Sequence, residues 1–200
     1  MKEMQSVADS LQAEGRKGYP IVGGASSPLG ALGYVACAEE IVAQAFDMGI
    51  QIDSVICATG SAGTHSGLLA GFWGDNSDIS VVGINVSRTK EAQEKIVFDL
   101  TTKTVALLGA RGEVPPHAVE CFADYVGPGY SLPTEGMVEA VKMLARTEAV
   151  LLDPVYTDTP KTGHLEFCLE FGNDEALALR GQVLGLRPGE EVGADNRPAM

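Results

Sequence analysis

The stretch SVICATGSAGTHSGLLAG, residues 54–71, governs how the rest of the chain is interpreted. It opens with an apolar run rich in β-branched residues, breaks at a loop of glycine and hydroxyl residues, and resumes as small and apolar residues at helical spacing. That order predicts a strand, a tight loop and a helix. Where a parallel strand ends, a ligand meets the N-terminus of the next helix, whose free N–H groups and positive dipole end favour an anion.

The loop between the expected strand and helix is therefore predicted to hold a phosphate. Gly60 and Gly63 would let the backbone turn sharply and approach the ligand. Ser61 and Thr64 would add hydroxyl hydrogen bonds, with Thr64 placed to cap the helix. The loop holds no basic residue and does not match G-x-x-x-x-G-K-[ST], which argues against a nucleoside triphosphatase. An ordinary strand-to-helix turn that merely needs glycine is the alternative.

Composition sets the class of protein. The chain has 200 residues, 45% of them hydrophobic, enough for one compact domain with a core. Its formal net charge of -13 argues against nucleic-acid and membrane partners. With a polar N-terminus and no run of about eighteen apolar residues, we expect a cytoplasmic protein. Buried free thiols are favoured over a disulfide or metal site for the four well-separated cysteines, Cys37, Cys57, Cys121 and Cys168.

The sequence up to Gly49 predicts a helix, a strand and a second helix. The first helix should end near Gly15, with Met4, Val7, Ala8 and Leu11 on one face. A short strand is expected at residues 19–22, followed by a glycine- and serine-rich loop. The helix after that loop should stop at Gly49 and turn these residues inward: Val35, Ala38, Val42, Ala45 and Phe46.

The alternation continues through the rest of the chain. Strands are predicted at residues 79–84 and 119–125, and helices at about 90–108 and after Thr134. Strands that alternate with helices of this length predict an α/β fold, a parallel sheet with helices on both faces. Residues 177–200, rich in glycine, proline and charge, are expected to form a mobile tail.

Three blocks of the sequence resemble one family of enzymes: GGASSPLGALGY at 23–34, ATGSAGTHSG at 58–67, and GPGYSLPTEGMVEAVKMLARTEAVLLDPVYT at 127–157. Together they look like the D-cysteine desulfhydrase and 1-aminocyclopropane-1-carboxylate (ACC) deaminase family, which uses pyridoxal 5'-phosphate (PLP) and has the tryptophan synthase β-like fold. The resemblance implies that residues 1–160 form part of that α/β fold. Residues 161–200 would be a divergent C-terminal segment.

The resemblance implies a role for each matching position. The residues that would cradle the PLP phosphate are Gly60, Ser61, Ala62, Gly63 and Thr64. Tyr130 and Tyr156 match two active-site tyrosines that flank the substrate, although without the resemblance each is a core or loop tyrosine. A phenol with a pKa near ~10 is a poor base, so either its pKa is lowered or it donates a hydrogen bond. Thr157 is counted with the cofactor-binding residues.

The implied reaction is a PLP-dependent lyase or deaminase reaction on a small amino acid. The cofactor ring is an electron sink for the carbanion formed at Cα, after which the β-thiol of D-cysteine leaves and pyruvate, ammonia and sulfide result. An ACC deaminase-like reaction is the alternative. Thr157 favours the desulfhydrase, because the deaminase branch usually carries Glu there. The family commonly forms dimers, so a homodimer is expected.

The chain departs from the family at both ends. Members are typically longer, and the missing part, expected before Met1, supplies the lysine that holds the cofactor. None of the lysines here has that N-K-x-R-K-like context, and Lys161, the nearest, is expected on the surface. From His164 onward nothing matches, as a shifted reading frame or an unrelated extension would explain. A catalytically inactive fragment that binds phosphate ligands or a partner chain is therefore a second hypothesis.

Other chemistry finds less support in the sequence. His65, directly after the loop, would either bind a phosphate or be a neutral helix-start residue. His117 and His164 have no ligand-spaced partners for a metal. A G-x-S-x-G elbow is absent, which argues against serine hydrolysis. A G-x-G-x-x-G loop with a following acidic residue is also absent, which argues against a Rossmann-like nucleotide binder.

Overall fold

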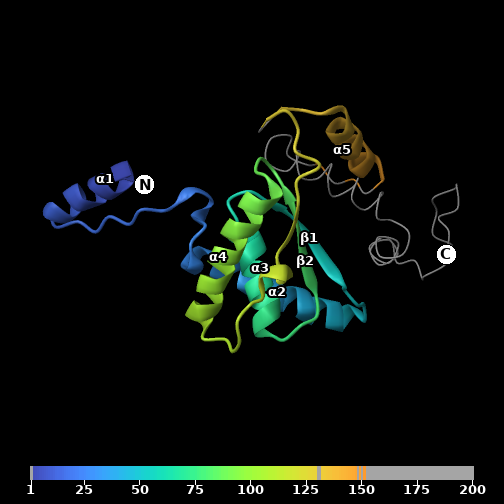
Figure 1. Cartoon of the computed structure of the whole chain (residues 1–200), viewed down its shortest axis with the longest axis horizontal. Coiled ribbons are helices and arrows are strands. Elements are labelled where there is room, and N and C mark those ends of the chain that lie inside the picture. Colours follow the sequence, from blue (N-terminus) through green and yellow to red (C-terminus); the bar gives the residue numbers. More distant parts are fainter. Residues whose placement is uncertain (1, 130–131, 148, 150, 152–200) are drawn as a thin grey trace, which may run out of the picture.

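The computed structural model describes residues 2–129, 132–147, 149 and 151 (Figure 1). The three strands form a parallel sheet in the order β1-β2-β3. Strands and helices alternate along the chain, so the predicted α/β class is confirmed. The elements, in chain order, are α1 (Lys2–Ala13), η1 (Gly23–Ala25), α2 (Pro28–Met48), β1 (Ser54–Thr59), α3 (Gly63–Gly74), β2 (Ser80–Asn85), α4 (Lys90–Leu108), η2 (Pro116–Ala118), β3 (Glu120–Phe122) and α5 (Glu135–Thr147).

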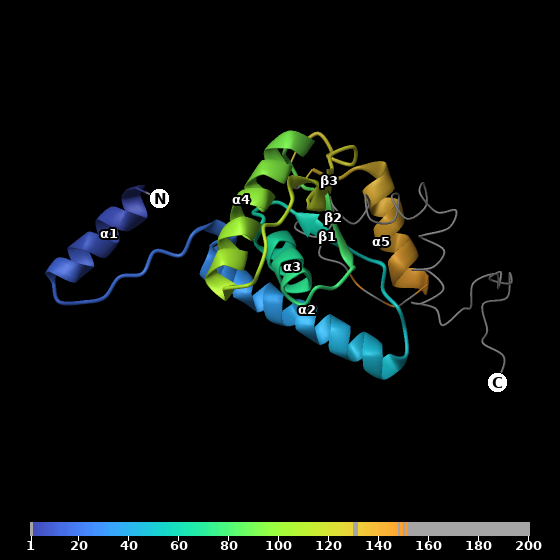
Figure 2. The same cartoon turned by 60° about the horizontal axis from the view of Figure 1, so that its bottom comes forward.

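Helix α3 is the centre of the core. Its buried residues lie on every side of the helix, which is typical of a helix enclosed by other elements. It packs on α2, α4, β1 and β2, and Figure 2 shows it between α2 and the strands. A Cβ at Gly67 would lie 2.4 Å from the Ala31 carbonyl oxygen, and one at Gly71 would lie 2.6 Å from the Ala38 Cβ. These glycines therefore let α2 approach the backbone of α3.

Helices α3 and α4 pack against the strands of the sheet. Cys57, Val81 and Cys121 on the three strands belong to the same hydrophobic cluster as residues of α3 and α4. In both views α5 lies on the other side of the strands from α3 and α4 (Figures 1 and 2). Helix α5 begins directly after Thr134, as predicted, with Met137 buried.

The strand predicted at residues 19–22 does not form. Tyr19 and Ile21 are 73% and 66% exposed, and this segment runs outside the sheet, joining α1 to the body of the molecule (Figure 1). Without a neighbouring strand to take up its N–H and C=O groups, an apolar run of this length has no reason to become a strand. On α1 itself Ala8 is buried, whereas Met4 and Val7 are exposed.

Helix α2 confirms most of its predicted pattern. Val35, Ala38 and Ala45 are buried, and Gly49 ends the helix in the left-handed conformation, with φ 68°. The prediction for Phe46 was wrong, because its side chain is 84% exposed. Adjacent positions on a helix are about 100° apart, so burial of Ala45 turns Phe46 away from α3.

By length and composition alone, α2 is apolar enough to cross a membrane. The core helix of a globular protein and a signal sequence pass the same test, and 22% of this apolar window is buried. Here Ala31 and Ala38 are completely buried, and α2 packs along α3.

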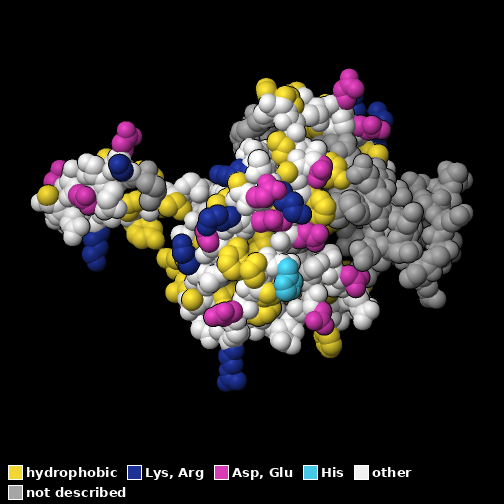
Figure 3. Space-filling model, in the orientation of Figure 1, with side chains coloured by type: hydrophobic (Ala, Val, Ile, Leu, Met, Phe, Trp, Pro, Cys, Tyr) yellow, Lys and Arg dark blue, Asp and Glu magenta, His cyan; other side chains and the backbone are white. Residues whose placement is uncertain are grey.

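Helix α4 has the limits predicted from sequence. The Thr89 side chain caps its first turn, and Gly109 closes it with φ 67°. Side chains of both charges gather over α4 on the face drawn in Figure 3. On α4, Lys95 Nζ lies 2.8 Å from Asp99 Oδ2. Strand β3, in contrast, is shorter than the predicted 119–125.

Candidate functional site

The loop between β1 and α3 turns at Ala62. Ala62 is the N-cap residue of α3 and has left-handed backbone angles, φ 76° and ψ -12°, without a side-chain cap. The predicted cap, Thr64, lies inside the first turn of α3 and does not cap it. Neither Gly60 nor Gly63 has a positive φ, so the sharp turn expected at the glycines is made by an alanine.

The two loop glycines serve close packing instead. A Cβ at Gly60 would lie 2.6 Å from Val86 Cγ2, and one at Gly63 would lie 3.0 Å from Ser26 Oγ. Gly60 therefore lets the loop after β2 lie against this one. Gly63 does the same for the segment before α2.

The N-terminus of α3 is open, unlike those of three other helices. At the starts of α2, α4 and α5 a side-chain hydroxyl accepts a backbone N–H. The acceptors are the hydroxyls of Ser27 (3.1 Å), Thr89 (3.4 Å) and Thr134 (3.2 Å). At α3 the first bond runs from the Ser66 N–H to the Ala62 carbonyl, at 2.9 Å. In the part of the chain that the structure describes, the N–H groups of residues 61–65 have no acceptor. Such unpaired donors at the positive end of a helix favour an anion.

A pocket of about 490 Å³ lies beside this open end. Ser61 and Ala62 line it from the loop, and the segment before α2 adds Ser26 and Ser27. Two cations, Arg88 and Lys103, also line it, together with one carboxylate, Asp99. A hydrogen bond from Lys95 lowers the pKa of Asp99 and keeps it ionised. The cations that the loop sequence lacks are therefore supplied by neighbouring segments.

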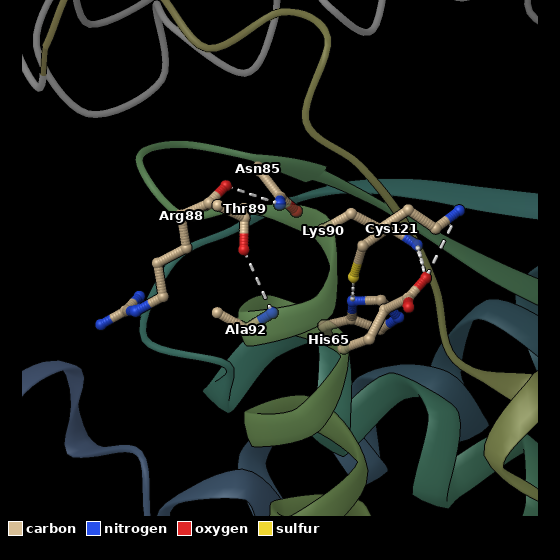
Figure 4. Close-up of polar contacts among 8 residues, drawn as sticks. His65, Asn85, Arg88, Thr89, Lys90, Ala92 and Cys121 are labelled. Atoms are coloured by element: carbon tan, nitrogen blue, oxygen red, sulfur yellow. Dashed lines mark hydrogen bonds and ion pairs between the residues drawn. The ribbon is translucent and has the colours of Figure 1, made fainter.

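Three polar residues at and beyond the end of β2 form a hydrogen-bond network with the loop after β1, and the sequence analysis missed them. Asn85 ends β2, and its Nδ2 donates to the Arg88 carbonyl at 3.0 Å (Figure 4). Arg88 Nη1 donates to the Gly60 carbonyl, and Gln93 Nε2 donates to Thr59 Oγ1 at 2.8 Å. The available signal was their position, because the ends of neighbouring parallel strands meet at one sheet edge.

His65 faces the sheet rather than the pocket. It is completely buried, its Nδ1 lies 4.0 Å from Cys121 Sγ (Figure 4), and a Cβ on Gly83 would lie 2.5 Å from the same nitrogen. Burial lowers the pKa of His65 to about 4, against a smaller opposing effect of the Val81 carbonyl. His65 is thus a neutral core residue at the start of α3, the second of the two alternatives.

The cysteines that the structure describes are free thiols. Cys57 and Cys121 are buried, and Cys37 is partly buried. Burial raises the pKa of both buried thiols to about 12, with added repulsion from Cys121 at Cys57 and from Glu94 at Cys121. Both thiols are therefore protonated and unreactive at neutral pH. Within the same residues no cluster of three or more His, Cys, Asp or Glu side chains forms a metal site.

Comparison with known proteins decides the family. The model of the family described as "Pyridoxal-phosphate dependent enzyme" matches residues 1–178, most of the chain. The chain belongs to this family. Proteins of the pyridoxal-phosphate dependent enzyme family depend on a cofactor that ends in a phosphate, the kind of group that the open end of α3 favours.

Curated relatives narrow the resemblance within the pyridoxal-phosphate dependent enzyme family. The D-cysteine desulfhydrase of Salmonella typhi is 39% identical over 164 residues, which cover 82% of this chain and 49% of that protein. The D-cysteine desulfhydrase of Salmonella paratyphi C is 38% identical over the same length. A solved structure described as an ACC deaminase homologue superposes with a TM-score of 0.72 at 34% identity, covering 91% of this chain and 51% of that one. The chain thus spans about half the length of these relatives.

The predicted site residues fall into two groups. The loop residues Gly60–Thr64 lie together at the open end of α3, beside hydroxyl and cationic side chains that fit a phosphate. Tyr130, Tyr156 and Thr157 lie outside the residues that the structure describes, as do Cys168 and the segment from 161 onward.

Proposed function

We propose that Gly60–Thr64 binds the phosphate of pyridoxal 5'-phosphate, and that the chain forms part of a lyase or deaminase that resembles D-cysteine desulfhydrase. The expected substrate is a small amino acid, D-cysteine, which would yield pyruvate, ammonia and sulfide. We expect this activity in the cytoplasm. One observation carries the proposal: α3 alone among α2–α5 lacks a hydroxyl cap at its N-terminus, although it starts at the carboxyl edge of a parallel sheet.

The residues of the loop would hold the phosphate mainly through their backbone. The N–H groups of residues 61–65 would donate to its oxygens, with the Ser61 hydroxyl as a further donor. Arg88 and Lys103 would offset its negative charge from the wall of the pocket. When bound, the cofactor supplies an electron sink for the carbanion at Cα of an amino acid. Tyr130 and Tyr156 would flank the substrate as hydrogen-bond donors, and Thr157 would lie by the cofactor.

Two alternatives within this proposal concern the substrate and the completeness of the site. An ACC deaminase-like reaction is supported by the solved homologue, whereas Thr157 and the curated relatives favour D-cysteine. A catalytically inactive chain that binds phosphate compounds, or a partner chain, is supported by a different fact. The chain covers 49% of its first relative, and none of its lysines matches the lysine motif expected of the family.

Binding of the phosphate is tested by calorimetric titration with three probes: pyridoxal 5'-phosphate, pyridoxal, and inorganic phosphate. We expect pyridoxal, which lacks the phosphate, to bind at least about tenfold more weakly than its phosphate ester. Ser61→Asp places a negative charge at the open end of α3 and should abolish binding of the ester and of inorganic phosphate. Ser10→Asp, on the exposed face of α1, is the matched control. Equal affinity for pyridoxal and its ester would contradict the proposal.

Turnover separates the alternatives. Purified protein with added pyridoxal 5'-phosphate is incubated with D-cysteine, with L-cysteine or with ACC, and sulfide and 2-oxo acids are measured. Sulfide from D-cysteine supports the desulfhydrase, and 2-oxobutyrate from ACC supports the deaminase. Cofactor binding with no product from any substrate supports the catalytically inactive chain. Light scattering on the same samples reports whether the chain is a dimer.

A further inference from the structure

The loop after β1 is fastened by the segment that follows β2. Three donors from residues 86–93 reach two neighbouring residues of that loop. The Val86 N–H donates to the Thr59 carbonyl at 3.1 Å, and Gln93 Nε2 donates to Thr59 Oγ1 at 2.8 Å. Arg88 Nη1 donates to the Gly60 carbonyl. All the bonds therefore end on the residues that directly precede the unpaired N–H groups of the open end of α3.

The position of these bonds sets how firmly the loop is held. Thr59 and Gln93 are 1% and 0% exposed, so their bond cannot be replaced by one to water without opening the core. The Gly60 carbonyl is held by Arg88 alone of these donors. Since the next residues carry the unpaired N–H groups, rotation of the Gly60 peptide would redirect the first of them.

Arg88 is itself held through both its backbone and its side chain. Its backbone carbonyl accepts from the Nδ2 of the buried Asn85, and its Nη1 lies 3.4 Å from Gln93 Oε1. Figure 4 shows the side chain extending away from Asn85, toward the loop that precedes α3. A guanidinium carries five N–H donors, of which the described contacts use Nη1. Arg88 also lines the pocket, together with Ser61.

We propose that Arg88 is a positioning residue for the open end of α3. By holding the Gly60 carbonyl it keeps the N–H groups of residues 61–65 directed at an anion, and its charge lies in the pocket wall where that anion binds. The identity of this anion as the cofactor phosphate rests on the proposed function. The role of Arg88 in holding the loop is independent of that function.

The test combines hydrogen exchange of the ligand-free protein with titration. Arg88→Gln removes the charge and the planar set of guanidinium N–H donors. Arg88→Lys keeps the charge but cannot reach both Gly60 and Gln93 in the same geometry. The matched control is Arg111→Gln, an exposed arginine beyond the other end of α4. Amide exchange is followed in peptides covering residues 60–72, and inorganic phosphate and pyridoxal 5'-phosphate are titrated into each variant.

We expect Arg88→Gln and Arg88→Lys to speed exchange of the hydrogen-bonded Ser66 amide, which donates to the Ala62 carbonyl, at least about fivefold, with Arg111→Gln unchanged. Phosphate affinity should fall about tenfold in Arg88→Gln and less in Arg88→Lys, which keeps the charge. Unchanged exchange in both Arg88 variants would overturn the positioning role even if phosphate binding weakened. If the wild type binds no phosphate, the proposed function fails, while the exchange result still decides the role of Arg88.

Discussion

Helices α3 and α4 both start at the carboxyl edge of the sheet, and they start differently. Helix α4 is closed by its own sequence, because the Thr89 hydroxyl accepts the Ala92 N–H and β2 leads into it through a buried Asn85. Helix α3 has an alanine at the same position, in the left-handed conformation, with no side-chain cap. Both features of the α3 start have a cost: a missing cap gives up about 1 kcal/mol, and a left-handed alanine costs roughly 1–2 kcal/mol.

Under the proposed function, the difference marks where the chain gives up stability for a phosphate-binding surface. If α3 does not stabilise its own first turn, other contacts must hold it in place. Among these contacts are the close approach of Gly67 to α2 and the burial of His65 against β2 and β3. The three predictions below test this comparison, from the largest expected effect to the smallest.

The contact of α3 with α2 should be the stronger support. Gly67→Ala would place a Cβ 2.4 Å from the Ala31 carbonyl oxygen, a backbone atom that cannot move aside cheaply. We expect a loss of about 3 kcal/mol in the free energy of unfolding, measured in urea. Gly33→Ala, on α2 with no atom within 4 Å of the new Cβ, should instead stabilise by up to about 1 kcal/mol. Equal effects of the two substitutions would show that α3 is not held by this contact.

The burial of His65 should make stability depend on pH. Its pKa is lowered from 6.5 to about 4 in the folded protein, so the unfolded chain takes up a proton first. Its contribution is therefore complete above pH 6.5 and is lost as the pH falls toward 4. Between pH 7.5 and pH 5 we expect the free energy of unfolding to drop by about 2 kcal/mol. His65→Gln, neutral throughout, should remove this slope, and a slope that persists in the variant would assign it to other groups.

The caps themselves should give the smallest effects, with opposite signs. Thr89→Ala removes the cap of α4 and should cost about 1 kcal/mol. Ala62→Gly relieves the left-handed alanine at α3 but gains entropy in the unfolded chain, so we expect a stabilisation of about 0.5 kcal/mol. Thermal unfolding of each variant measures its change in stability relative to the wild type. A loss of stability in Ala62→Gly would mean that the methyl group of Ala62 is needed for packing.

Local sequence signals predicted the parts of the fold that local contacts determine. Helix α4 was predicted at its observed limits from its mixed polar and apolar pattern, and the structure adds a Thr89 cap before it and Gly109 after it. The strand and helix around the loop were predicted because apolar periodicity changes there from strand to helix. The strand predicted at residues 19–22 was wrong. The apolar composition of these residues suits a strand, but a strand also needs a neighbouring strand, which the local sequence does not specify.

The site was predicted in outline only. Its location followed from the order of strand, loop and helix. The turn at Ala62 was missed because glycine is the expected residue at a positive φ. The two nearby glycines instead leave room for Val86 and Ser26, which pack closely against them. Arg88 was missed because its contact with Gly60 spans 28 residues of sequence. No local pattern reports which side chain of the next loop will turn back.

The glycine in the middle of β2 has a consequence for redox chemistry. Gly83 lies in register between Cys57 on one neighbouring strand and Cys121 on the other. Adjacent strands are about 4.8 Å apart, so the two cysteine Cα atoms are separated by nearly 10 Å, beyond the roughly 7 Å that a disulfide can span. An oxidant therefore cannot crosslink this pair while the sheet is intact. Formation of that bond would report that β1 and β3 have come away from β2.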